Sequence, residues 1–340
     1  MSQNNSSGQQ PLWRVADPKT FEATVVLTAQ QLRIQPLAVE KDYWICEALR
    51  SIESSFPNQV IFKGGTSLEK LRLIQRFSED LDLLYVGSAA TKSLVNRQLK
   101  RLCKTASSSV GGTSAWLRSG GELGRIHRSE YLYPVLSQQA LEGTALADPD
   151  RFLIELGQSG GSHPSKPREV SSLLTRQLLQ SPNRPMGFAD LEPFTVQVLH
   201  PGRTLLEKLL RVNNFVLMED AQREYHGWPR IGRQFYDIWA LLGSQEVLTF
   251  LADHETVRNV LADCYEVSKS FHSDEPPPNG GFAQSAAFAP KGKLADALRV
   301  QHERAMREFY YGFDSSPSFD EVLERVHAHK ASLNVDSIYQ

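Results

Sequence analysis

Long apolar runs and closely spaced cysteines are missing from this sequence. No apolar stretch approaches the roughly 20 residues that a membrane-spanning helix needs. The polar opening, MSQNNSSGQQ, lacks the apolar core of a signal peptide. The three cysteines, Cys46, Cys103 and Cys264, lie far apart, a spacing that fits neither a zinc site nor a disulfide framework. We therefore expect a cytoplasmic protein with reduced thiols and a disordered segment over residues 1–12.

A surplus of one charge is also missing. The sequence has 37 lysines and arginines against 39 aspartates and glutamates, a net charge of -2. This balance gives no overall attraction to nucleic acid, so any RNA contact must come from a local patch. At 340 residues the chain is long enough for two modest domains. We predict an α/β domain over residues 13–200 and a mainly helical lobe over residues 201–340.

The clearest local pattern combines two short strands, two glycines and a helix. Residues 60–62 form an apolar run typical of a strand, and residues 63–65 predict a turn after it. Thr66 or Ser67 can then cap an amphipathic helix. Residues 80–86 predict a second strand, so the whole segment is expected to be strand, turn, helix, loop and strand.

Two aspartates, Asp80 and Asp82, lie two residues apart on the second predicted strand. Because strand side chains alternate, both carboxylates should point to one face of the sheet. Paired carboxylates repel each other unless a cation lies between them, and Mg²⁺ is the usual occupant, with Mn²⁺ as an alternative. A lone Asp-x-Asp is also common in solvated turns, so the pair gains its weight from the glycines ahead of it.

The glycine turn predicts an anion site. Without Cβ atoms, Gly64 and Gly65 let a ligand reach the backbone N–H groups, and the N-terminus of the helix that follows attracts negative charge. A phosphate-binding turn opposite an acidic metal site is an arrangement suited to a nucleoside triphosphate.

These segments closely resemble the AbiEii/MenT nucleotidyltransferase toxins, which belong to the DNA polymerase β-like nucleotidyltransferase superfamily. The resemblance rests on KGGTSL at residues 63–68 and RFSEDLDL at residues 76–83. Residues 204–208, TLLEK, resemble the family's Thr-x-x-Glu-Lys helix. Residues 233–237, RQFYD, resemble its Arg-His-x-x-Asp helix, with Gln234 in place of the usual histidine. The resemblance implies an α/β fold: a polymerase β-like palm, with a small mixed sheet and flanking helices, followed by a C-terminal helical lobe.

The resemblance also implies roles for single residues. The catalytic residues would be Asp80, Asp82, Lys208 and Asp237. The metal ligands would be Asp80, Asp82 and Glu155, the last on a strand predicted over residues 151–156. The nucleotide would be bound by Lys63, Gly64, Gly65, Thr66, Ser67 and Arg76. Purely structural alternatives stay open: Glu155 could face solvent, Lys208 could form a Glu–Lys surface pair, and Asp237 could pair with Arg233 four residues before it.

A basic stripe is predicted on the helix expected over residues 91–106. Its members recur at helical spacing on one side: Arg97, Lys100, Arg101 and Lys104. A solvated helix face is one explanation of this pattern. RNA-backbone binding is the other, because phosphates attract rows of lysine and arginine.

For activity, the resemblance implies a toxin of a toxin–antitoxin or phage-defence system. Such a protein transfers a nucleoside monophosphate from an NTP to RNA, with the tRNA 3′ end as the leading acceptor. Pyrophosphate is released and translation is inhibited. A separately encoded antitoxin is implied as well. Transfer to a protein hydroxyl and a non-catalytic nucleotide-binding module remain alternatives, and the sequence determines neither the nucleotide nor the oligomeric state.

Ser78 lies two residues before Asp80 and is a candidate regulatory residue. Our hypothesis is that phosphorylation of Ser78 would place two negative charges against the metal site and inhibit the enzyme.

Overall fold

The computed structural model of the chain describes residues 10–117, 127–133, 149–158, 160–268 and 275–335. Most of the predicted disordered segment, residues 1–12, therefore lies outside the described residues. Within the described ranges, no helix is both long and apolar enough to cross a membrane. All three cysteines are buried and none forms a disulfide.

The fold is mixed α/β, as predicted, and its centre is a seven-stranded sheet within the described residues. The strands are β1 (Val60–Lys63), β2 (Asp80–Tyr85), β3 (Thr113–Leu117), β4 (His127–Tyr133), β5 (Phe152–Gly157), β6 (Ser165–Val170) and β7 (Phe194–Leu199). Their order across the sheet is β3-β4-β5-β2-β1-β7-β6. The pairs β2–β5 and β1–β7 are parallel, while the other neighbours are antiparallel.

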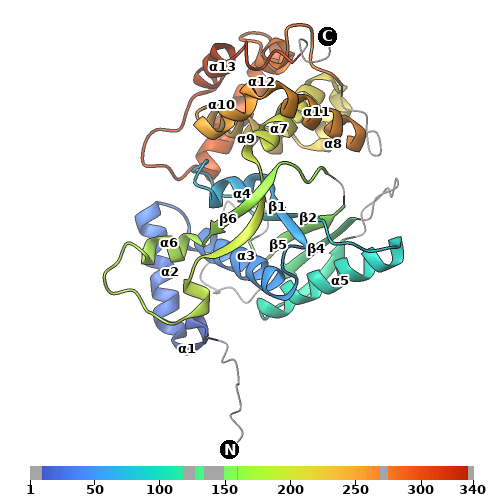
Figure 1. Ribbon diagram of the computed structural model, residues 1–340. Coiled ribbons are helices and arrows are strands. Elements are labelled where there is room, and N and C mark those ends of the chain that lie inside the picture. Colours follow the sequence, from blue (N-terminus) through green and yellow to red (C-terminus); the bar gives the residue numbers. More distant parts are fainter. Residues whose placement is uncertain (1–9, 118–126, 134–148, 159, 269–274, 336–340) are drawn as a thin grey trace, which may run out of the picture.

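Among the described residues, six helices and one 3₁₀ turn precede the last strand. They are α1 (Trp13–Ala16), α2 (Pro18–Leu32), α3 (Pro36–Ser55), α4 (Gly64–Lys70), α5 (Lys92–Ser109), α6 (Leu173–Leu178) and η2 (Ala189–Leu191). Figure 1 shows α3 and α5 on one side of the sheet and the helices that follow the last strand on the other. The apolar faces of α3 and α5 join Leu81 and Leu83 of β2 in one hydrophobic core. This burial fixes the orientation of β2, because its alternate residues must then face the opposite side.

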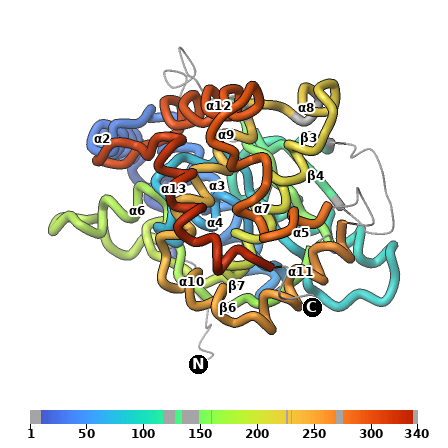
Figure 2. Tube along the Cα trace, turned by 90° about the horizontal axis from the view of Figure 1, so that it is seen from above, coloured from blue at the N-terminus to red at the C-terminus, as the bar shows by residue number. Residues whose placement is uncertain are grey.

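The chain after β7 is helical in its described parts. Its elements are α7 (Pro201–Leu217), α8 (Asp220–His226), α9 (Trp228–Leu242), α10 (Gln245–Ala252), α11 (His254–Ser268), η3 (Phe282–Gln284), η4 (Ala286–Phe288), α12 (Lys293–Phe309) and α13 (Phe319–Ala328). They gather around a second hydrophobic core, which also takes in Leu68 of α4 and Ile74. Figure 2 views the same elements from above, with α7 and α9 passing over the middle of the molecule. The predicted boundary between two domains at residues 200/201 stays a proposal.

Helix α7 begins directly after β7, and local sequence explains where. Pro201 occupies the first turn, where its missing N–H costs nothing, and the His200 ring accepts a hydrogen bond from the Gly202 N–H at 3.0 Å. The start of α7 is thereby fixed just after the C-terminal end of β7. This places the predicted site lysine, Lys208, two turns along a helix that lies over the sheet.

Candidate active site

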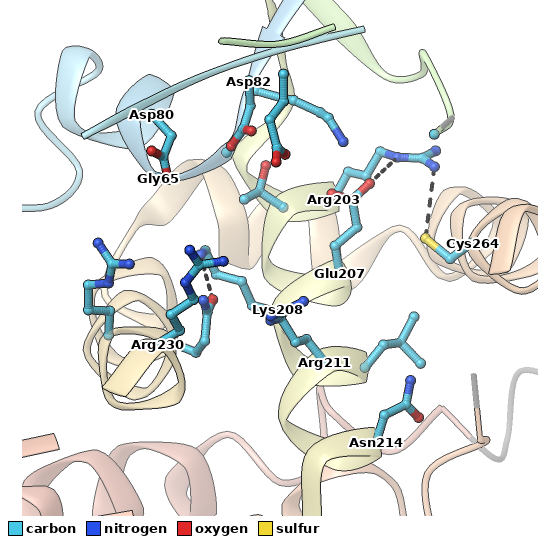
Figure 3. A pocket seen from close by; sticks show the side chains of 18 of the residues that line it. Gly65, Asp80, Asp82, Arg203, Glu207, Lys208, Arg211, Asn214, Arg230 and Cys264 are labelled. Atoms are coloured by element: carbon cyan, nitrogen blue, oxygen red, sulfur yellow. Dashed lines mark hydrogen bonds and ion pairs between the residues drawn. The ribbon is translucent and has the colours of Figure 1, made fainter. Parts of the chain in front are cut away.

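A cavity of about 580 Å³ lies between the sheet and helices α7 and α9. Most of the residues predicted from the sequence line it: Lys63, Gly64, Gly65, Arg76, Ser78, Asp80, Asp82, Glu155 and Lys208. In Figure 3, Asp80 and Asp82 project from the sheet toward Lys208, Arg211 and Arg230 on the facing helices. One wall of the cavity is therefore acidic and the opposite wall is basic.

The acidic wall follows from strand register. Lys63 of β1 is the register partner of Asp82 of β2, and Asp82 is in turn the partner of Glu155 of β5. The three side chains thus form one row across neighbouring strands, and the Glu155 carboxylate raises the pKa of Asp82. The structure therefore brings Glu155 beside Asp82, although 72 residues of intervening sequence made this contact invisible to local patterns.

The electrostatics of this wall are unfavourable for the bare protein. Burial and the neighbouring Glu155 raise the pKa of Asp82 to about 7, and burial together with Asp82 raises the pKa of Asp80 to about 6. Carboxylates held this close resist ionisation because their charges repel and little water reaches them. A cation placed among them would relieve both effects.

The donor set fits a hard divalent cation better than a soft one. Within the described residues, no group of three or more His, Cys, Asp or Glu side chains is arranged so that it could hold a metal ion, so Asp80, Asp82 and Glu155 do not form a three-ligand set. Mg²⁺ does not need three protein ligands, because it is usually held by one or two carboxylates together with water and substrate phosphates. Asp80 and Asp82 would supply the carboxylates, with Glu155 beside Asp82.

The two glycines line the cavity and leave room for side chains of the site. At Gly64, with φ of +74°, a Cβ atom would collide with the Asp82 carboxylate. At Gly65, a Cβ atom would lie 2.6 Å from Nη2 of Arg76 and 3.0 Å from Oγ of Ser78. The space that the glycines leave is thus filled by the protein's own side chains. Their absence of side chains lets the site groups approach the backbone of α4.

The local structure after the glycines differs from the expectation. Helix α4 begins at Gly64 and has no side-chain cap, so neither Thr66 nor Ser67 is an N-cap. Both side chains are buried and outside the cavity lining. The Thr66 hydroxyl donates to the Asp80 carbonyl oxygen, and the Ser67 hydroxyl donates to the Gly64 carbonyl oxygen at 2.8 Å. The Thr66 contact ties α4 to β2, whereas the Ser67 contact lies within α4. Both hydroxyls thus have protein acceptors, and their contact with phosphate stays a prediction.

The lysine of the site is held by two neighbours. Nζ of Lys208 lies 2.7 Å from Oδ2 of Asp237 and donates to Oε1 of Gln234 at 2.8 Å. Burial lowers the pKa of Lys208, an effect that the charge of Asp237 opposes. Gln234, which stands where the proteins that this sequence resembles have a histidine, is therefore a neutral acceptor for the ammonium group.

Asp237 is fully buried and holds two cations at once. Arg76 donates through Nε and Nη2 to its two carboxylate oxygens, each at 2.6 Å. Burial opposes the ionisation of Asp237, but Arg76 and Lys208 outweigh it and hold its pKa below the usual value. Because Asp237 is not part of the cavity lining, we assign it a positioning role through Lys208. The sequence-based alternative, a pair with Arg233, is not the contact observed; the partners are Arg76 and Lys208.

The segment that carries Arg76 is fixed to the C-terminal part of the chain. The Phe77 N–H donates to the Phe309 carbonyl oxygen at 2.8 Å, and the Tyr311 N–H donates to the Gln75 carbonyl oxygen at 2.9 Å. Arg76 and Tyr310 form an antiparallel bridge between these bonds. The residues just before β2 are thereby attached to the end of α12, which aligns the two walls of the cavity.

Three arginines of the cavity were not predicted: Arg203, Arg211 and Arg230. A helical-spacing argument could have found two of them. Arg211 follows Lys208 by three residues on α7, and Arg230 precedes Arg233 by three residues on α9. Residues three apart lie on the same helix face, so each arginine accompanies a residue already singled out.

The predicted RNA-binding stripe lies elsewhere. All four side chains are exposed on α5, and none lines the cavity: Arg97, Lys100, Arg101 and Lys104. Helix α5 packs on the face of the sheet that carries Leu81 and Leu83, opposite the face that carries Asp80 and Asp82. The stripe and the cavity are therefore separated by the sheet, and RNA binding by the stripe stays a prediction.

Comparison with models of known protein families gives a match over most of the chain. A family described as "Nucleotidyl transferase AbiEii toxin, Type IV TA system" matches residues 47–325 of the chain. The matched region contains the cavity, its acidic strands and its basic helices. No individual curated protein matches the sequence.

Proposed function

The chain belongs to the AbiEii nucleotidyl transferase toxin family of type IV toxin–antitoxin systems, and on this premise we propose that it transfers a nucleoside monophosphate from an NTP to an RNA acceptor. The leading acceptor is the 3′ end of tRNA, and the products are extended RNA and pyrophosphate. Modification of tRNA would inhibit translation. A separate antitoxin would counteract the toxin.

The observation that supports this proposal most directly is the pairing of an acidic wall with a basic wall across one cavity. Asp80 and Asp82 stand opposite Lys208, and the volume of about 580 Å³ suits a nucleotide. Nucleotidyl transfer depends mainly on positioning and on neutralising the charge of the phosphates. A cavity with both charge signs on facing walls meets these two needs.

The chain's own residues divide the work as follows. Asp80 and Asp82, supported by Glu155, would hold the cation. Lys208, oriented by Asp237 and Gln234, neutralises the negative charge that develops on the leaving pyrophosphate. When bound, Mg²⁺ would supply Lewis-acid activation of the phosphate and lower the pKa of the attacking hydroxyl. Lys63, next to Asp82 in the strand row, is a further phosphate contact.

Transfer to a protein hydroxyl is the second candidate. It would use the same residues with a different acceptor, and the exposed stripe on α5 favours RNA because it offers a row of cations to a phosphate backbone. A non-catalytic nucleotide-binding module is less consistent with the cavity, since a binding module gains nothing from carboxylates that destabilise one another.

A labelling assay tests the proposal. Purified protein, Mg²⁺ and each α-labelled NTP would be incubated with total tRNA or with total protein, beside an Asp80→Ala variant. Label in tRNA with the wild type alone supports the proposal and identifies the nucleotide. Label in protein transfers support to the second candidate. If no acceptor is labelled although the NTP binds, the proposed enzymatic function is wrong.

A further inference from the structure

The cations of the cavity fall into two groups according to their partners. Arg203 donates to Glu207 at 3.1 Å and to Asp263 at 2.6 Å, and Lys208 shares Asp237 with Arg76. The charges of these side chains are compensated within the protein. Such residues can position neighbouring groups, but they have little positive charge left for a ligand.

The second group has no hydrogen-bond or ion-pair partner among the described residues and comprises Lys63, Arg211, Arg230 and Arg233. Arg233 lies over the Phe309 ring, 5.1 Å from its centroid, and Lys63 lies beside Asp82 on the acidic wall. Arg211 and Arg230 are the two solvent-exposed members. Figure 3 shows both side chains beside Lys208, on the side of the cavity that faces Asp80 and Asp82. Two helices therefore bring two unpaired guanidinium groups to one wall.

The Arg211 and Arg230 side chains also influence each other electrostatically, and Arg230 influences Asp80. Desolvation within the cavity lowers the pKa of Arg211, and the positive charge of Arg230 lowers it further. On the acidic side, Arg230 favours the ionised form of Asp80, so this guanidinium lies within electrostatic range of the proposed metal site. Like charges placed together without a counter-ion are unfavourable, and an anion bound between them would remove that cost.

We propose that Arg211 and Arg230 together bind the terminal phosphates of the NTP substrate. This inference rests on the proposed function and adds to it the residues that recognise the triphosphate tail. Guanidinium groups suit this task because their N–H donors match two phosphate oxygens at once. With Asp80 and Asp82 at the α-phosphate, a tail directed toward α7 and α9 passes Lys208 and ends between the two arginines.

The geometry favours a triphosphate over an RNA backbone. Both arginines lie on the same wall as Lys208, opposite the carboxylates, which is where the departing pyrophosphate must be accommodated. A polyphosphate also concentrates more negative charge over a short distance than a single backbone phosphodiester does. We therefore expect the pair to discriminate triphosphates from monophosphates.

Calorimetric titration with inorganic tripolyphosphate tests this directly, because that probe contains no base, sugar or reactive acceptor. Full-length wild type would be compared with Arg211→Gln and Arg230→Gln, with and without Mg²⁺. Each substitution should weaken tripolyphosphate binding about tenfold or more, as expected for the loss of charge-assisted hydrogen bonds. Arg307→Gln is the matched control, since Arg307 is exposed on α12 outside the cavity. Its affinity should equal that of the wild type.

Two further arms separate the possible outcomes. The variants should lose more affinity for an NTP than for the corresponding NMP, and their affinity for a short single-stranded RNA should change little. Lost RNA binding with intact tripolyphosphate binding would assign the pair to the acceptor and overturn the proposal. Undetectable tripolyphosphate binding by the wild type in both buffers would overturn it too.

The readout is independent of catalysis. If the wild type binds tripolyphosphate through the two arginines but labels no acceptor, the proposed function fails while the anion site stands. If it labels tRNA and the variants bind tripolyphosphate normally, the function stands and the anion site fails. Thermal unfolding of each variant would verify that it is folded before binding is measured.

Discussion

Arg76 and Asp237 meet through two parallel hydrogen bonds of 2.6 Å across 161 residues of sequence. The Asp237 carboxylate also lies 2.7 Å from Nζ of Lys208. A buried carboxylate with two cations is costly to break, since either remaining partner would be left without compensation. The contact thus couples the segment before β2 to the helix that carries the site lysine.

Asp237→Asn should lower stability in a way that depends on pH. Removing one member of a buried ion pair costs roughly 3–5 kcal/mol. Because Arg76 and Lys208 hold the pKa of Asp237 below its usual value, its contribution is present above the unfolded-state pKa of about 3.9. It is lost as the pH falls through the lower folded-state pKa.

Urea unfolding between pH 2 and pH 8 would measure this difference. The difference in the free energy of unfolding between wild type and Asp237→Asn should be constant at neutral pH and should narrow only at the acidic end. A gap that instead grew as the pH fell would contradict the assignment of Asp237 as the ionised partner.

Asp82→Asn should separate activity from stability. The substitution removes a carboxylate from the proposed metal site, and transfer should fall by at least about a hundredfold. The metal-free protein should unfold at the same or a higher temperature, because the substitution ends the close contact of Asp82 with a second carboxyl group, Glu155. Asp314→Asn, at an exposed position, is the control and should change neither property. A strongly destabilised Asp82→Asn would mean that the carboxylate is a structural residue.

The sequence predicted the parts of the site that depend on local alternation. Asp80 and Asp82 share a strand and a face, and Leu81 and Leu83 occupy the buried face, as a period of two requires. The contact between Asp82 and Glu155 depends on the pairing of β2 with β5. No local pattern specifies that register.

Tertiary packing adds neighbours that the sequence did not reveal. Glycines were expected to open the backbone to a ligand; both line the cavity, and the groups that a Cβ atom would meet at Gly64 and Gly65 are side chains from β2 and the loop before it. Those neighbours come from tertiary packing. In the same way, Arg76 was expected to bind nucleotide, and its partner on α9 became apparent only in three dimensions.

Gly64→Ala should reduce activity for a steric reason that a matched control can isolate. Gly64 and Gly111 both have positive φ angles, +74° and +68°, so alanine at either position is strained by about 1–2 kcal/mol. A Cβ atom at Gly64 would displace the Asp82 carboxylate, whereas a Cβ atom at Gly111 would meet no atom within 4 Å. The two variants should therefore have similarly lowered melting temperatures but different transfer rates. Both variants should lose some stability, and only Gly64→Ala should lose most of its activity; equal activity in the two would contradict this account.

Neutralising the stripe on α5 should affect long and short acceptors differently. The variant would carry glutamine at Arg97, Lys100, Arg101 and Lys104. Because the sheet separates the stripe from the cavity, a short oligonucleotide that ends in the tRNA acceptor sequence should be modified at the wild-type rate. Binding of whole tRNA should weaken and become less salt-dependent if its body reaches α5. Unchanged tRNA affinity over a range of salt concentrations would identify the stripe as a solvated helix face.

Ser78→Asp should inhibit transfer, because the new carboxylate would enter a cavity wall where negative charge is already in excess. Ser78 lines the cavity together with Asp80 and Asp82, whose pKa values are raised by burial and by neighbouring carboxyl groups. Ser78→Asn has nearly the same shape without the charge and is the matched control. We expect the aspartate variant to lose at least about tenfold in transfer rate, and the asparagine variant to stay close to the wild type.

Transfer rates of the wild type, Ser78→Asp and Ser78→Asn, measured over a Mg²⁺ titration, would test this prediction. Full activity of Ser78→Asp would exclude charge at this position as a regulatory switch, while equal losses in both variants would show that the size of the side chain matters and its charge does not.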